Sequence, residues 1–133
     1  MKPKPYGDDR YTEAQMRAFI IDGLREKSMR WSCKTNAKRL ARDGYLVNPE
    51  TGKNNLASKC ASCGKRVFEK EAVVDHIEPV VPVEGFTGEM FLGYNWNQYL
   101  RRLFCEIDGF QVLCKPCHKI KSKKESEERR KNE

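Results

Sequence analysis

Apolar residues recur at helical spacing in two stretches near the start of the chain. Thr12 and Gln15 fit a capping box, in which two side chains serve the first free backbone N–H groups of a helix. The apolar face of that helix consists of Met16, Phe19, Ile20 and Leu24. A second helix is expected over about 35–42, and Gly44 is well placed to stop it. Its apolar side consists of Ala37, Leu40 and Ala41.

The middle of the chain mixes turn signals with short apolar runs. Residues 47–58 are rich in Asn, Pro and Gly, which predicts a loop or linker. Short strands are expected at 67–68 and 72–74, with a turn at 69–71 between them. The apolar segment 78–83 contains two prolines, and these argue against a central strand.

Helical spacing returns from about Asn95, and an apolar stripe with aromatic residues indicates a core-facing helix. This stripe consists of Trp96, Tyr99, Leu100, Leu103 and Phe104. Residues 110–113 predict a short strand, and Pro116 suits the first turn of a following helix. The last residues, 125–133, are charged without an apolar face, which predicts a solvated helix end that frays.

Composition adds a small core and a positive charge to this pattern. Of the 133 residues, 38% are hydrophobic and 34% are charged, so a structural metal would be one way to stabilise the fold. The formal net charge of +7 suggests a polyanionic partner, above all nucleic acid. The alternative is a soluble protein that happens to be basic.

We expect one domain with appendages. The divisions are a flexible N-terminus at 1–11, a helical region at 12–58, the central domain at 59–124 and a charged tail at 125–133. The N-terminus has no apolar run after its first charges, and every apolar run is too short to span a bilayer. The expected location is therefore cytoplasmic, without a membrane partner.

Four of the six cysteines form two Cys-x2-Cys pairs. They are Cys60, Cys63, Cys114 and Cys117. In a reducing cytoplasm such pairs indicate metal ligands rather than disulfides. Because four thiolates close the tetrahedral sphere of Zn2+, they predict a structural zinc, with coincidental cysteines as the alternative. Cys33 and Cys105 lie outside this spacing and are expected to be small buried or half-buried residues.

An Asp75-His76 step lies between the two pairs, and His118 directly follows Cys117. A lone histidine is often just hydrogen-bonded in a core. If the strand that carries Asp75 and His76 packs beside the helix that carries His118, however, the three side chains converge. A carboxylate and an imidazole with open positions suit a divalent ion that also binds phosphate and water. A spare imidazole can take a proton from that water, so these are parts for phosphodiester hydrolysis.

The segment from about Cys60 to Lys124 resembles the HNH endonuclease family, with its ββα-metal motif, in the version stapled by a four-Cys zinc. The resemblance rests on Val74-Asp75-His76-Ile77-Glu78-Pro79 and on Gln111-Val112-Leu113-Cys114-Lys115-Pro116-Cys117-His118-Lys119-Ile120-Lys121. The chain looks most like the small HNH proteins of bacteriophages. The resemblance implies an α+β fold, in which N-terminal helices precede a zinc-stapled ββα-metal core.

The resemblance also implies a role for each matched position. Asp75 and His118 would hold the catalytic divalent ion, which could be Mg2+, Mn2+ or Ni2+. His76 would be the general base. Lys121, one turn after His118, would neutralise a scissile or neighbouring phosphate.

One position departs from the family pattern. The family usually has an Asn two residues before the Gln of the Gln-x-Leu-Cys strand, where it helps to hold the loop that positions the base. This chain has Gly109 there. The candidates to replace it are Asp108, Asn95 and Asn97.

Basic residues of the N-terminal helices are candidate contacts to DNA phosphates. They are Arg25, Arg30, Lys34, Lys38 and Arg39. The alternative is a helical pair that simply packs on the metal domain. The two are compatible, since an amphipathic helix can pack with one face and contact phosphates with the other.

These observations predict a metal-dependent DNA endonuclease that nicks or cuts both strands. A catalytically inactive, zinc-stapled DNA-binding module explains the charge and the cysteines, but not the Asp-His and Cys-His steps. A protein that uses zinc only for stability is a third alternative, and the basic helices count against it. If a bacteriophage encodes the chain, we expect it in the host cytoplasm, with packaging or recombination proteins as candidate partners. The sequence gives no sequence preference, cut geometry or oligomeric state.

Overall fold

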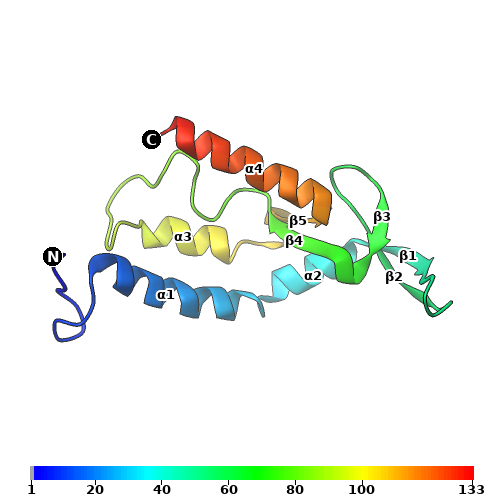
Figure 1. Cartoon of the computed structure of the whole chain (residues 1–133), viewed down its shortest axis with the longest axis horizontal. Helices are drawn as coiled ribbons and strands as arrows, with labels where there is room; N and C mark the ends of the chain where they lie inside the picture. The colour runs from blue at the N-terminus through cyan, green and yellow to red at the C-terminus, as the bar shows by residue number, and fades with distance from the viewer. Residues whose placement is uncertain (1) are drawn as a thin grey trace.

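The computed structural model describes residues 2–133 and combines helices with two small antiparallel sheets. Figure 1 shows α1 (Glu13–Ser28) and α2 (Ser32–Leu40) along one side and α4 (Lys115–Lys131) along the other. The short α3 (Trp96–Leu103) lies between them (Figure 1). No helix within residues 2–133 is both long and apolar enough to cross a bilayer.

The first sheet has the strand order β1–β2–β3 and lies at one end of the molecule (Figure 1). Its strands are β1 (Arg42–Val47), β2 (Asn54–Lys59) and β3 (Arg66–Phe68). The second sheet pairs β4 (Ala72–His76) with β5 (Phe110–Cys114), and it packs between α2 and α4. Separate helices beside antiparallel strands are compatible with the expected α+β class.

The N-terminal helices form close to where they were predicted, but part of their apolar surface stays in solvent. The capping box of α1 is confirmed, with Thr12 Oγ1 accepting from the Gln15 N–H at 3.1 Å. Each apolar face contains an exposed residue, since Phe19 is 70% and Leu40 75% exposed. The second helix ends before Gly44, which lies in β1 with φ +68° at an irregularity of the strand register. Glycine suits that left-handed position because it has no Cβ.

The loop predicted for 47–58 is wrong in its second half, where β2 forms. The turn itself is shorter, and the Asn48 N–H donates to the Lys53 carbonyl at 2.8 Å. β2 pairs with β1 on one side and β3 on the other, which buries Ala57 and Ser58 completely. The small and polar residues of β2 do not show the hydrophobic alternation of a strand. The strand forms because it pairs on both sides, not because its residues have a high β propensity.

The strands predicted around 67–68 and 72–74 are confirmed, but they do not pair with each other. The turn between them is a short 3-10 helix, η1 (Glu69–Glu71). β3 joins β2, whereas β4 pairs with β5 in a register that sets Asp75 opposite Gln111. The two strands of the expected ββα-metal core are therefore not joined by a tight turn, because a long connection that contains α3 links β4 to β5.

The predicted helix after Asn95 is confirmed and supplies much of the core. Tyr99 and Leu103 of α3 are buried, whereas Leu100 is 37% exposed. Asn95 Oδ1 accepts from the Gln98 N–H and so caps the first turn. After Leu103 the chain passes through a second 3-10 helix, η2 (Ile107–Gly109), into the buried strand β5.

Helix α4 begins as predicted with Pro116 in its first turn, and it stays helical through the expected charged tail as far as Lys131. Near its end, the Arg129 guanidinium donates to the Val81 carbonyl at 2.8 Å, and the Asn132 amide donates to the Val83 carbonyl at 3.2 Å. These contacts attach the loop that follows β4 to α4.

Candidate functional site

Two groups of side chains stand out at the two ends of β5. The first is the set of four paired cysteines, whose Sγ atoms all lie within 4.8 Å of one another. Cys60 and Cys63 come from the turn after β2, while Cys114 and Cys117 come from the junction of β5 with α4. Cys60 and Cys114 are buried in a small cluster with Leu113. These four residues could therefore hold a metal ion, as their spacing predicted.

The pKa values of Cys60 and Cys117 are shifted in opposite directions. Burial raises the pKa of Cys60, but hydrogen bonds from the backbone around Cys114, Cys63 and Ser62 outweigh it and lower the pKa to about 6. Hydrogen bonding to Cys114, followed by burial, raises the pKa of Cys117 to about 12. Four thiolates this close would repel one another, and a tetrahedral Zn2+ removes that conflict. The donor set fits a closed structural zinc site.

The second group forms around Asp75, whose side chain is 16% exposed. Strand β4 presents this carboxylate to the first turns of α4. Asp75 Oδ1 lies 3.6 Å from His118 Nε2. Its other oxygen, Oδ2, accepts from Lys121 Nζ at 2.8 Å and from the Gln111 amide at 3.4 Å. The structure therefore brings together the predicted pair of ligands, and it divides the two carboxylate oxygens between different partners.

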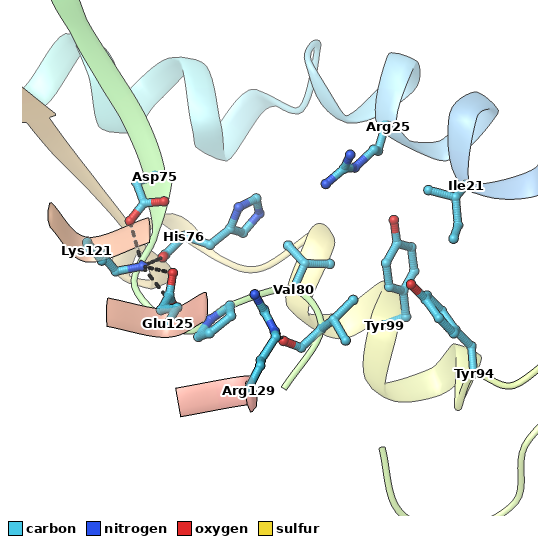
Figure 2. A pocket seen from close by; sticks show the side chains of 12 residues that line it. Ile21, Arg25, Asp75, His76, Val80, Tyr94, Tyr99, Lys121, Glu125 and Arg129 are labelled. Carbon is cyan, nitrogen blue, oxygen red and sulfur yellow. Dashed lines mark hydrogen bonds and ion pairs between the residues drawn. The ribbon is translucent and has the colours of Figure 1, made fainter. Parts of the chain in front are cut away.

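Lys121 has more partners than sequence reasoning assigned to it. Its Nζ also donates to the His76 carbonyl at 3.0 Å and to the Glu125 carboxylate at 3.2 Å. Burial alone would lower the pKa of Lys121, but hydrogen bonds to Asp75 and Glu125 outweigh it and raise the pKa. The ammonium is thus held by four protein acceptor atoms rather than directed into solvent (Figure 2).

His76 points to the other side of β4 from Asp75. Its Nε2 lies 3.0 Å from the Leu103 carbonyl, and its ring packs on Phe110 with the centroids 4.7 Å apart. Burial lowers the pKa of His76, and the charge of Lys34 lowers it further. Since a carbonyl can only accept, Nε2 carries the proton, and Nδ1 is the basic nitrogen of the neutral ring.

The loop after His76 is held by backbone contacts and by Arg102, without an Asn at the position of Gly109. The Ile77 N–H donates to the Gly109 carbonyl at 2.9 Å, and Arg102 Nε donates to the Pro79 carbonyl at 2.7 Å. A Cβ on Gly109 would meet Cys105 Sγ at 2.7 Å, so close packing explains the glycine. The expected substitutes do not act here, because Asn95 caps α3 and no side-chain hydrogen bond of Asp108 or Asn97 occurs within residues 2–133.

The predicted basic residues divide into two groups. Arg25 lines the cavity beside His76, and the charge of Lys34 acts on His76 directly. Lys34 and Lys38 also border a shallow hollow next to β4. Arg30 and Arg39 are exposed and do not line the cavity. The structure therefore brings only part of the predicted DNA-contact set close to Asp75 and His76.

A cavity of about 500 Å³ opens next to this group and is shown in Figure 2. α1, the loop after β4, α3 and α4 all contribute to its lining. Tyr99, Glu125 and Arg129 are among the contributors that were not singled out from sequence as site residues. The helical spacing of His118, Lys121, Glu125 and Arg129, by three, four and four, marks one face of α4 and could have indicated the last two. No sequence signal marked Tyr99 as a site residue, because aromatic residues at helical spacing indicate a core-facing helix.

Comparison of the chain with models of known protein families, with curated proteins and with solved structures found no match.

Proposed function

We propose that this protein is a divalent-metal-dependent DNA endonuclease of the HNH type. The observation that carries the proposal is the pairing of Asp75 Oδ1 with His118 Nε2 at 3.6 Å, next to the half-buried His76 on the same strand. The strand pair β4–β5 followed by α4 supports a ββα-metal arrangement. The net charge of +7 supports a polyanionic substrate.

The Asp75–His118 pair fits a divalent ion. Two ligand atoms that each lie about 2.1 Å from one ion stand about 3 to 4 Å apart, and the observed 3.6 Å falls in that range. Lys121 and Gln111 hold Oδ2, so they orient the carboxylate and leave Oδ1 to face the imidazole. With only two protein ligands, an ion bound here would keep open positions for water and phosphate oxygens, and it would stabilise the charge that develops on the phosphate.

His76 is the proposed general base. Its Nε2 donates to the Leu103 carbonyl, and this hydrogen bond fixes the ring. Nδ1 is then free to accept a proton from the attacking water. The lowered pKa keeps the imidazole neutral near pH 7, as a base requires. Lys121 anchors Asp75 and the His76 carbonyl, so in this state it positions the site rather than binding phosphate.

A second candidate is a zinc-stapled DNA-binding module without turnover. The observation that favours it is the ion pair between Lys121 and Asp75 at 2.8 Å, which already neutralises the carboxylate without any metal. In that case Asp75 and His118 would be structural.

Cleavage of supercoiled plasmid separates the two candidates. Zinc-loaded protein would be incubated with plasmid in buffer without added divalent ion, and then with Mg2+ or Mn2+ added. The nuclease proposal expects nicked or linear product only after the addition, and the ratio of the two products distinguishes nicking from double-strand cutting. A shift of the plasmid on a gel without cleavage in any of these ions would replace the nuclease with the binding module.

A further inference from the structure

The cavity beside His76 is larger than a metal and a phosphate need. Its volume of about 500 Å³ falls within the range of about 300–1,000 Å³ typical of small-molecule sites. Asp75, His76 and Lys121 form one end of its lining. The opposite part is formed by Ile21 and Arg25 of α1 and by aromatic residues on or before α3 (Figure 2). Substrate held at Asp75 would therefore extend over this cavity.

Tyr99 leaves unused hydrogen-bonding capacity in the wall of the cavity. The residue is only 2% exposed, and within residues 2–133 its hydroxyl has no hydrogen-bond partner. An unpaired buried hydroxyl is destabilising and therefore needs an explanation. Figure 2 shows the phenol directed toward α1, with Arg25 reaching into the space between Tyr99 and His76. The Arg25 guanidinium lies near the Tyr99 hydroxyl, but it makes no hydrogen bond or ion pair within the described chain.

The lining suits a nucleobase better than a second phosphate. Besides Arg25, it presents the rings of Tyr94 and Tyr99 and the apolar side chains of Ile21, Pro79 and Val80. Aromatic rings and guanidinium planes stack on bases, and a hydroxyl can donate to or accept from a base edge. Because the Glu125 carboxylate also lines the cavity, a second phosphate would face a negative charge there.

We infer that this cavity holds the base of an unpaired nucleotide next to the scissile phosphate, with the Tyr99 hydroxyl and Arg25 as its polar contacts. A base that stays paired in a duplex cannot enter a space enclosed by helices on several sides, so the preferred substrate is DNA with an unpaired nucleotide. This inference rests on the proposed DNA substrate. It assigns to Tyr99 a role in base binding that its place in the core does not require.

The test measures DNA binding by the full zinc-loaded chain in buffer without added divalent ion, so that nothing is cleaved. Two fluorescent duplexes are compared, one with a single unpaired adenosine and one with an abasic nucleotide at the same position. Wild type is expected to bind the first about tenfold more tightly, which lies within the range expected for stacking of one base on aromatic side chains. Tyr99→Phe is expected to reduce this ratio by about fivefold, the effect of one hydrogen bond.

Tyr45→Phe is the matched control, because it removes a hydroxyl from exposed strand β1. It should leave the ratio unchanged. Tyr99→Phe should not lower the melting temperature, since the hydroxyl that it removes has no partner. Equal binding of the two duplexes by wild type, an unchanged ratio in Tyr99→Phe, or a clear loss of its thermal stability would each overturn the inference.

The result is independent of cleavage. A preference for the unpaired base without plasmid cleavage would keep the cavity assignment and remove the nuclease. Plasmid cleavage by a protein without that preference would keep the nuclease and overturn the cavity assignment.

Discussion

At the scale of single residues, the site depends on how Asp75 divides its two oxygens. Oδ2 is occupied by Lys121 and Gln111, while Oδ1 faces His118. The charge of Lys121 is in turn shared with Glu125. All three ionic side chains are less than one quarter exposed, so their interactions are only partly screened by water.

Replacement of Lys121 by Met should therefore destabilise the protein. The variant leaves Asp75 and Glu125 as partly buried carboxylates without their shared cation, at a cost of about 1–3 kcal/mol in the free energy of unfolding. Urea denaturation of the variant measures this cost. Lys123→Met is the matched control, because Lys123 is exposed on the same helix, and its effect should stay within about 0.5 kcal/mol. Equal effects of the two changes would show that the Lys121 contacts do not stabilise the fold.

Sequence alone could predict the identity of the main residues but not their contacts. Asp75, His76 and His118 were found because an Asp-His step lies between the two cysteine pairs and a histidine directly follows Cys117. The contacts of Lys121 with Asp75 and with the His76 carbonyl could not be predicted, since they depend on how α4 crosses β4. The role of Gly109 could not be predicted either, because it depends on tertiary contacts. Its backbone carbonyl accepts from the Ile77 N–H and so holds the loop, and Cys105 occupies the space that a side chain would need.

At the scale of secondary structure, the site is assembled where β5 passes into α4. Cys114 ends the strand, Cys117 lies in the first turn of the helix, and His118 follows directly. A metal bound by the four cysteines would therefore fix the helix that carries His118 and Lys121. The structural site and the proposed catalytic site are coupled through this short segment.

Loss of one cysteine ligand should unfold this region. Cys114→Ser is expected to abolish zinc binding and to lower the melting temperature strongly, because the free energy of zinc binding contributes directly to folding in small metal domains. Zinc content and circular dichroism melting measure the two effects. Cys33→Ser is the matched control, since Cys33 lies outside the cluster, and it should keep both values. A zinc-free Cys114→Ser protein with an unchanged melting curve would contradict the structural role.

The elements differed in how well their sequence predicted them. Helices α1, α3 and α4 carry clear signals, namely a capping box, an apolar stripe and a proline in the first turn. β2 carries none, because its buried residues are Ala57 and Ser58 and its first two residues are asparagines. The pairing of the strands could not be predicted from sequence either, since β4 and β5 are far apart along the chain.

At the scale of the whole molecule, basic side chains from two helices lie near His76. Arg25 and Lys34 come from different helices, and both act near the imidazole. Lys38 borders the same side of β4 as Lys34. If DNA lies along this side, its binding should release counterions and weaken as salt rises.

Duplex binding by Lys34→Gln tests this arrangement. Removal of one phosphate contact should lower the slope of log affinity against log salt by about 0.9. Lys27→Gln removes the same charge from an exposed position of α1 that lies two residues, and about 200°, from Arg25. It should leave the slope close to that of wild type, as measured by fluorescence anisotropy. A flat salt dependence in wild type would argue against phosphate contacts altogether.

The central claim is that His76 acts as the base in metal-dependent DNA cleavage. The most direct measurement compares the rate of plasmid cleavage by wild type and His76→Ala, both zinc-loaded and with Mg2+ or Mn2+ added. We expect the variant to cleave about 100- to 10,000-fold more slowly, the usual contribution of a general base, while its zinc content and DNA affinity stay close to those of wild type. Cleavage by His76→Ala at the wild-type rate would contradict the claim.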